Sequence, residues 1–348
     1  MISSKKKVAV LFGGCSSEYE VSLQSAAAIL AHIDRQRYQI IMIGIRRDGE
    51  WFLYEGPVAA VGQDTWHAGE EVYPVTIAPG QMSCGFVVSR AGLITQVSVD
   101  AALPVLHGTN GEDGTVQGLL ALAGIPVIGC DVLSSAVCMD KDMAHRIVSR
   151  EGIRVPRSRL LKKGEEFFAP QYAAEIGYPV FIKPLRAGSS FGITKVPGEW
   201  ELNEAIGRAL QYDTMLVMEE AINGFEVGCA ILGDTELTIG EVDEITLTEG
   251  FFDYTEKYTL AHSQIHVPAR ISPEQAARIK DTAVRIFRTL RCRHFARVDM
   301  FLTPDGEIYF NEVNTIPGFT QHSRYPAMLQ QAGVNFGDMV NRMLEMVV

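Results

Sequence analysis

The chain has 348 residues, of which 42 are acidic and 31 basic, so its formal net charge at pH 7 is −11. Hydrophobic residues make up 47% and charged residues 21%, the balance of an ordinary globular protein of two or three domains. The acidic balance argues against nucleic-acid binding, and no apolar run approaches the roughly 18 residues of a membrane span. The apolar run at the start is too short for a secretory signal. We therefore expect a cytoplasmic protein that binds neither nucleic acid nor membranes.

The cysteines do not form any C-x-x-C pair, so the sequence carries no zinc or redox signature. The six are Cys15, Cys84, Cys130, Cys138, Cys229 and Cys292. We predict free thiols, as is usual in a reducing compartment.

The first part of the chain alternates buried apolar runs with helical segments. The predicted strands are residues 8–12, 38–45, 101–106 and a short one near Val127. The predicted helices are residues 22–33 and 115–123. Residues 46–98 mix glycine, proline and apolar residues and give no clear pattern. The alternation is typical of an open α/β sheet.

A second segment, from about residue 131, continues the alternation. It predicts helices over residues 141–150 and 202–210 and strands over 178–184, 193–196 and 215–219.

The last third predicts two hairpins and a long helix. The hairpins are residues 225–242, turning at Gly233-Asp234, and residues 295–314, turning at 303–306. Between them Ser272 is placed to cap a helix, with proline next and Gln275 at the third position, the pattern of a capping box.

The last hairpin carries four polar residues at alternating positions, Arg297 and Asp299 on one strand and Glu312 and Asn314 on the other. If Leu302 pairs with Glu307, all four side chains share one face, with diagonal neighbours roughly 7–8 Å apart. Carboxylate and amide oxygens are the ligands that Mg²⁺ prefers. A solvated polar face explains the same pattern equally well.

A glycine- and serine-rich loop, residues 188–192, follows a strand that ends in Lys183. Backbone N–H groups of such a loop can bind phosphate oxygens, and the lysine can neutralise them. An ordinary linker has the same composition. Glu219 and Glu226 could likewise meet an adenine and a ribose, or be surface acids.

Two further segments have open interpretations. His107, next to a glycine-rich loop, is either catalytic or an ordinary loop histidine. Residues 252–258 are polar and aromatic, and form either a loop that closes over a site or a surface loop.

In this order the motifs resemble the D-alanine–D-alanine ligase family, and in type the D-alanine–D-serine ligases of vancomycin resistance. The resemblance runs from about Lys7 to the C-terminus and is weakest over 46–98. Its marks are Glu18-Tyr19-Glu20-Val21-Ser22, the loop 107–114, Met139-Asp140-Lys141, Gly188-Ser189-Ser190, Glu256-Lys257-Tyr258, Arg297-Val298-Asp299 and the segment 311–318.

The resemblance implies an α/β ATP-grasp fold: a Rossmann-like N-terminal domain (1–130), a central domain (131–224) and a C-terminal metal-binding domain (225–348). It implies that ATP phosphorylates the carboxylate of D-alanine. The amine of a second D-amino acid then attacks the acyl phosphate, giving a dipeptide for peptidoglycan synthesis, ADP and phosphate. We also expect a homodimer.

The resemblance also implies roles for single residues. Two Mg²⁺ ions, replaceable by Mn²⁺, bind Asp299, Glu312 and Asn314. The residues implied to contact ATP are Lys141, Lys183, Ser190, Glu219, Ile222, Glu226 and Lys257.

Other matched positions concern the amino-acid substrates. Glu20 matches the carboxylate that holds the first ammonium, Ser189 and Tyr258 its hydrogen-bonded bridge, and His107 a histidine near the first substrate. Arg297 and the Gly318 N–H match the pair that stabilises the oxyanion, and Ser323 matches the group that holds the second carboxylate.

Arg324 directly follows Ser323, where D-alanine-specific members carry an aliphatic residue. Its guanidinium could hydrogen-bond a serine hydroxyl, so we expect D-serine to be preferred over a second D-alanine. One alternative is that Arg324 points outward or supports the packing of Tyr325 in a housekeeping D-alanine–D-alanine ligase. Another is that the chain is a nucleotide-binding homologue without catalysis. Another ATP-grasp ligase, acting on a purine precursor or on bicarbonate, has no reason to keep the Glu20, Ser189 and Tyr258 set. A D-lactate-using ligase would lack the Lys257-Tyr258 pair.

Overall fold

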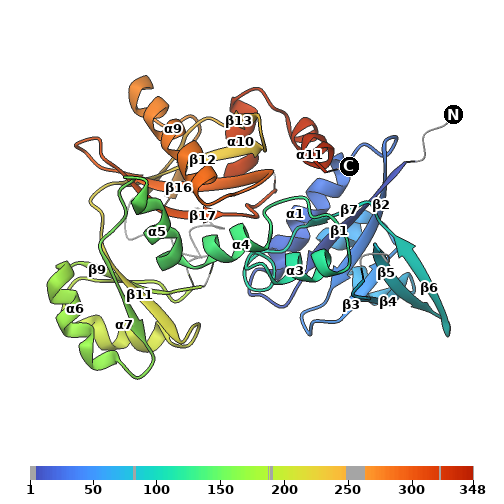
Figure 1. Ribbon diagram of the computed structural model, residues 1–348, viewed down its shortest axis with the longest axis horizontal. Helices are drawn as coiled ribbons and strands as arrows, with labels where there is room; N and C mark the ends of the chain where they lie inside the picture. The colour runs from blue at the N-terminus through green and yellow to red at the C-terminus, as the bar shows by residue number, and fades with distance from the viewer. Residues whose placement is uncertain are drawn as a thin grey trace.

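The computed structural model describes residues 5–80, 84–186, 188, 191–247, 263–320 and 323–347. Over these residues the strands form three sheets of seven, four and six strands, which we call the N-terminal, central and C-terminal sheets. Figure 1 shows the N-terminal sheet at one end of the molecule and the other two at the opposite end, with α4 between them. The sheets fall within the three segments expected from the sequence, and the division into domains stays a prediction.

The N-terminal sheet has the order β6-β5-β4-β3-β2-β1-β7. Its strands are β1 (Lys6–Gly13), β2 (Tyr38–Ile45), β3 (Trp51–Tyr54), β4 (Val72–Ile77), β5 (Gly85–Arg90), β6 (Leu93–Ser98) and β7 (Ala101–Pro104). Its helices are α1 (Tyr19–His32), α2 (Val58–Gly62) and α3 (Thr115–Leu122). Strand β1 runs parallel to β2 and β7, so the loops after β1 and β7 meet at one edge, where ligands of α/β sheets bind.

The central sheet has the order β10-β9-β11-β8 and is entirely antiparallel. Its strands are β8 (Ser158–Lys162), β9 (Val180–Pro184), β10 (Thr194–Val196) and β11 (Met215–Glu220). The helices of this region are α4 (Val132–Met139), α5 (Lys141–Arg150), α6 (Ala169–Ile176) and α7 (Leu202–Ala209). Buried apolar residues of α6 and α7 pack with those of the strands in one core, among them Ala173, Ile206 and Ile182.

The C-terminal sheet has the order β15-β14-β12-β16-β17, with β13 paired to β12. Its strands are β12 (Phe225–Gly233), β13 (Leu237–Ile239), β14 (Asp243–Leu247), β15 (Ser263–His266), β16 (Phe295–Leu302) and β17 (Ile308–Asn314). Its helices are α9 (Pro273–Thr289), α10 (Arg324–Gln331) and α11 (Phe336–Glu345). Helix α9 begins with the predicted capping box between Ser272 and Gln275.

The two ends of the chain share one hydrophobic core. Leu23 of α1, Phe319, Tyr325 of α10 and Met343 of α11 are all buried in it. In Figure 1 α11 lies beside α1. Full burial of each such side chain contributes about 1.5–3 kcal/mol, so this core holds the N-terminal sheet against the last helices and fixes the edge where they meet.

The state of the cysteines and the length of the helices can now be compared with the sequence. All six cysteines are free thiols, as predicted, and burial raises the pKa of the Cys229 thiol to about 12. Over the described residues, no helix has the length and apolar character needed to cross a membrane.

Candidate active site

A β-bulge aligns the four polar residues of the last hairpin. The predicted pairing of Leu302 with Glu307 is wrong, because Leu302 pairs with Ile308. In that register Glu312 would face away from Asp299. The bulge between Asp299 and Met300 inserts Asn311 as an extra residue. Asp299 therefore lies opposite Glu312, and the shared face predicted from the sequence is present.

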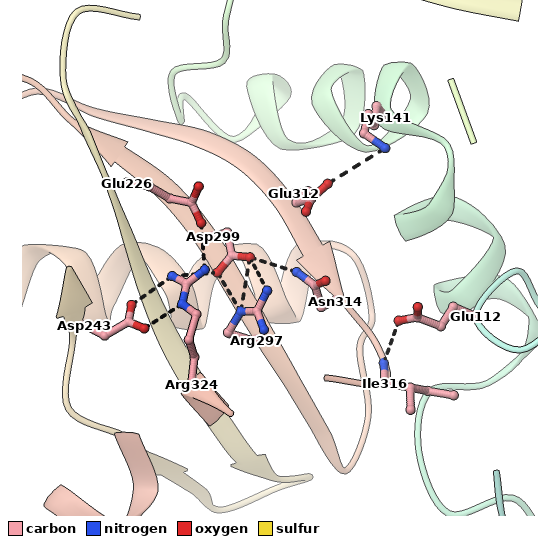
Figure 2. A network of polar contacts seen from close by, with 10 residues as sticks. All are labelled: Glu112, Lys141, Glu226, Asp243, Arg297, Asp299, Glu312, Asn314, Ile316 and Arg324. Atoms are coloured by element: carbon pink, nitrogen blue, oxygen red, sulfur yellow. Dashed lines mark hydrogen bonds and ion pairs between the residues drawn. The ribbon is translucent and has the colours of Figure 1, made fainter. Parts of the chain in front are cut away.

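Asp299 is the centre of this face (Figure 2). It is almost fully buried and accepts hydrogen bonds from Arg297 Nε at 2.8 Å and Arg297 Nη2 at 2.7 Å. Asn314 Nδ2 donates to Asp299 Oδ2 at 2.8 Å, which leaves the amide oxygen of Asn314 directed elsewhere. Burial of Arg297 alone would lower its pKa, but the charge of Asp299 raises it, so the guanidinium stays protonated.

Buried lysines carry the positive charge on the opposite side of the site. Lys141, at the first turn of α5, lies 3.8 Å from Glu312. Lys183 Nζ donates to Glu219 Oε2 at 2.5 Å, and both side chains are buried. Burial alone would raise the pKa of Glu219, but the Lys183 ammonium outweighs it and the pKa is lowered. One ammonium group thus lies beside Glu312 and the other beside Glu219, and ammonium groups of this kind can neutralise phosphate oxygens.

Glu18, not Glu20, is the acid that faces the site. Glu20 is exposed on the first turn of α1 and pairs with Arg47 at the surface. Glu18 precedes the helix, is buried, and lies so near Gly188 that a Cβ there would come 2.9 Å from Glu18 Oε2. The start of α1 thus separates the two acids of this motif, because Glu18 lies before the helix and is buried whereas Glu20 lies within it and is exposed. The structure therefore places Glu18, and not the expected Glu20, at the site, and the role of this acid is taken up as a proposal below.

His107 lies inside the junction between the first and last parts of the chain. Its Nδ1 lies 2.9 Å from the Ile316 carbonyl and its Nε2 3.3 Å from Ser25 Oγ. Burial lowers the pKa of His107, so the neutral ring donates from Nδ1 to that carbonyl. This geometry favours a role in positioning the loop over direct contact with a substrate.

Glu112 is a site residue that the sequence interpretation missed, although it lies in the quoted loop 107–114. Its carboxylate accepts from the backbone N–H groups of Gly108 and Ile316, both at 2.9 Å. Figure 2 shows the hydrogen bond from Ile316. Burial, with the charges of Glu18 and Glu312, raises the pKa of Glu112 to about 8. At neutral pH it is therefore mostly protonated, which lowers the negative charge of this corner.

Arg324 points inward into a network of carboxylates. Its Nε and Nη2 donate to the two oxygens of Asp243 at 2.6 and 2.9 Å, and its Nη1 donates to Glu226 at 2.7 Å. Asp299 Oδ1 lies 3.4 Å from Nη2, so the network reaches the face that Asp299 shares with Glu312 and Asn314 (Figure 2). Burial opposes its charge, but Asp243, Asp299 and Glu226 together raise the pKa of Arg324. The outward-pointing alternative is thus wrong.

Gly228 makes room for this network. A Cβ there would come 2.5 Å from Arg324 Nη2 and 2.7 Å from Asp243 Oδ1. Any other residue at this position of β12 would displace the guanidinium. No local sequence pattern marks Gly228 or Asp243 as site residues. Both lie close to Arg324, which is about 80 residues or more further along the chain.

Ser323 and Gly318 lie together beside Arg324. A Cβ on Gly318 would come 2.8 Å from Ser323 Oγ, and Ser323 Oγ also accepts from the Thr320 N–H at 3.0 Å. Ile222 lies just after β11, separated from Glu219 by Glu220 and Ala221. The predicted site residues Ser189, Ser190, Lys257 and Tyr258 lie outside the described residues.

A small cavity of about 30 Å³ connects the three parts of the chain. Its lining includes Glu112, Lys141, Gly188, Glu312 and Asn314, which come from N-terminal, central and C-terminal segments. Four of the motifs quoted for the resemblance, the loop 107–114, Met139-Asp140-Lys141, the motif that begins at Gly188 and the segment 311–318, thus contribute residues to this cavity.

Comparison with known proteins decides the family. Residues 7–130 match the family described as "D-ala D-ala ligase N-terminus", and residues 147–345 match "D-ala D-ala ligase C-terminus". The chain belongs to the D-alanine–D-alanine ligase family. This ligase is 43% identical to the vancomycin B-type resistance protein VanB of Enterococcus faecalis, covering 99% of both chains. It is 40% identical to a D-alanine–D-alanine ligase of Caldicellulosiruptor bescii, covering 99% of this chain and 96% of that one.

Solved structures agree with this membership. The crystal structure of the VanG D-Ala:D-Ser ligase from Enterococcus faecalis matches this ligase with a TM-score of 0.93 and 53% sequence identity. The match covers 99% of this chain and 100% of that chain. The predicted α/β ATP-grasp fold is confirmed.

The site fits the divalent ions that ligases of this family use with ATP. Among the described residues, no three His, Cys, Asp or Glu side chains gather closely enough to hold a metal by themselves. Asp299 and Glu312 supply two carboxylates, and Asn314 an amide oxygen. A donor set of this kind suits an ion that completes its coordination with phosphate oxygens and water, as Mg²⁺ does.

Proposed function

We propose that this ligase uses ATP to activate D-alanine and joins it to D-serine in preference to a second D-alanine, for peptidoglycan precursor synthesis. The observation that carries the choice of D-serine is the buried pair of Arg324 and Asp243 next to Ser323. The alternative is a housekeeping enzyme that adds a second D-alanine.

The preference follows from the polarity of this network. Because Arg324 already donates to Asp243 and Glu226, we expect it to act mainly by holding the Asp243 carboxylate in place. A serine hydroxyl can donate to such a carboxylate or accept from the guanidinium. The methyl group of D-alanine would only remove water from these charges, which is unfavourable.

The relatives supply support for the ligase reaction but differ in second substrate. The similar solved structure is titled a D-Ala:D-Ser ligase. A protein of Streptomyces coelicolor named a putative D-alanine–D-lactate ligase is 43% identical, and the relative from Caldicellulosiruptor bescii is named a D-alanine–D-alanine ligase. The proposal for D-serine therefore rests on the Arg324 network.

The remaining residues then have defined tasks. Glu18 holds the ammonium of the first D-alanine. Arg297 and the Gly318 N–H stabilise the negative oxygen that develops when the amine attacks. Lys141 and Lys183 neutralise phosphate oxygens, and bound Mg²⁺ would offset charge during phosphoryl transfer.

For the nucleotide we propose contacts with Glu219, Ile222, Glu226, Ser190 and Lys257. Ser189 and Tyr258 connect the closing loops to Glu18. We further propose two Mg²⁺ ions, replaceable by Mn²⁺, on Asp299, Glu312 and Asn314. We also propose a homodimer acting in the cytoplasm, where ATP is supplied.

Competition between D-alanine and D-serine at equal concentrations tests the second substrate. We expect the wild type to form D-alanyl-D-serine over D-alanyl-D-alanine by about 10–150-fold, the range of one hydrogen bond to a charged group of about 1.5–3 kcal/mol. In the double variant Asp243→Leu/Arg324→Met the ratio should fall at least about tenfold, because both charges are gone. Mass spectrometry of the products measures the ratio.

The control is Arg270→Met. Arg270 pairs with Glu244, which directly follows Asp243 on β14. It should leave the ratio unchanged. A wild type that makes mainly D-alanyl-D-alanine, or an unmoved ratio in the double variant, contradicts the proposal.

A matched pair of substitutions tests the first subsite. Glu18→Gln should raise the KM for the first D-alanine by at least about tenfold, because a hydrogen bond to a charged group is lost. Glu20→Gln should change it less than about twofold, since exposed ion pairs contribute little. Steady-state phosphate release measures both, and the opposite order would restore Glu20.

A further inference from the structure

His145 lies between the nucleotide side of the site and the metal face. It is a buried residue of α5, with 3% of its surface exposed. Its Nε2 lies 2.8 Å from the backbone carbonyl of Asn311. Because a carbonyl only accepts, Nε2 carries the proton and donates. The edge of its ring packs against Phe310, with ring centroids 5.3 Å apart, which fixes the orientation of the imidazole.

Asn311 is the extra residue of the bulge that turns Glu312 and Asn314 onto the Asp299 face. An extra residue in a bulge lacks its ladder partner, and a partly buried carbonyl such as that of Asn311 is less stable without a donor. His145 supplies that donor from a different element. The hydrogen bond therefore stabilises the bulged register against the regular one, in which Glu312 would face away from Asp299.

The other ring nitrogen faces the nucleotide side. His145 Nδ1 lies 3.9 Å from Glu219 Oε1, and neither atom has a hydrogen-bond partner in the structure. The second oxygen of Glu219 is held by Lys183 at 2.5 Å. The charged groups facing this ring are Glu219 and, beyond it, Lys183 and Lys141, which both act on Glu219. A single side chain thus touches the bulge and faces the acid proposed to meet the nucleotide.

We propose that His145 is a positioning residue that fixes the metal-binding face through the Asn311 carbonyl and couples it to Glu219. The inference rests on the proposed function only in that Asp299, Glu312 and Asn314 receive the divalent ion. Groups that orient metal ligands typically change metal affinity by about 10–100-fold when removed.

Binding of MnCl₂ to the enzyme saturated with ADP, followed by electron paramagnetic resonance of free Mn²⁺, tests this without ligation. His145→Phe keeps a ring against Phe310 but removes both nitrogens, and should weaken Mn²⁺ binding about 10–100-fold. His145→Gln places an amide N–H near the position of Nε2 and should recover affinity to within about threefold of wild type. His145→Asn places its amide near Nδ1, cannot reach Asn311, and should resemble the phenylalanine variant.

Met143→Gln is the matched control, because Met143 lies on the exposed side of the same helix. It should bind Mn²⁺ like the wild type. Phenylalanine and glutamine variants that lose affinity equally would show that the ring acts by packing alone and overturn the proposal, as would a phenylalanine variant with wild-type affinity. A wild type that binds no Mn²⁺ would instead overturn the metal assignment, and this inference with it.

Discussion

Glu312→Gln is expected to lower the rate of ligation by at least about 10³-fold while leaving the fold intact. Glutamine keeps the shape of the side chain but removes the charge, and loss of a major electrostatic stabiliser in a site of this kind has about this effect. Because glutamine fills the same space, the packing around position 312 should be kept. Phosphate release at saturating Mg²⁺, with D-alanine and D-serine as substrates, measures the loss.

Glu307→Gln is the control for this prediction, because Glu307 directly precedes the same strand of the hairpin and pairs with Arg154 at the surface. It should keep wild-type activity. Activity of Glu312→Gln near that of the wild type would contradict the placement of a metal ion on this face.

Arg324→Met alone is expected to destabilise the protein by about 3–5 kcal/mol. The substitution leaves Asp243, which is fully buried, without its bidentate partner, and an uncompensated buried charge has a cost of this size. The double variant Asp243→Leu/Arg324→Met should regain most of the loss, because buried ion pairs are often replaceable by apolar residues. Urea unfolding followed by circular dichroism measures the free energies.

Arg37→Met is the surface comparison, since Arg37 pairs with Glu345 and both are about half exposed. Its unfolding midpoint should equal that of the wild type. If Arg324→Met unfolds at the wild-type urea concentration, the network does not support the fold in the way its burial indicates.

Local patterns predicted the elements that depend on nearby residues. Ser272 and Gln275 signalled the start of α9 because a capping box is complete within four residues. The hairpin of β16 and β17 was predicted from its turn and its alternating residues. Helix α4 was missed, although Asp131 and Ser134 form a capping box there.

Residues 46–98 show why other elements could not be predicted. They contain β3 to β6, a run of antiparallel strands that extends the N-terminal sheet. Every described residue of β6 is at least partly exposed, so its sequence lacks the apolar alternation of a half-buried strand. Pairing with β5, and not its own pattern, makes it a strand.

The site divided along the same line. The shared face of Asp299, Glu312 and Asn314 lies within one hairpin and was predicted. The register of that hairpin was not, because a bulge leaves no mark in composition. The inward direction of Arg324 depends on Asp243, and that of Glu18 on where α1 begins. Contacts between distant segments decide both, and a single sequence does not contain them.

Substitution and deletion of Asn311 should have different effects on the bulge. The register of β17 against β16 depends on how many residues lie between Phe310 and Glu312, and the hydrogen bond from His145 goes to a main-chain oxygen that every amino acid possesses. Substitution at position 311 should therefore leave the geometry of the β16–β17 hairpin unchanged. Loss of that single codon would instead join Phe310 directly to Glu312 in a regular ladder, so Glu312 would stay opposite Asp299 while the carbonyl that His145 binds would be gone.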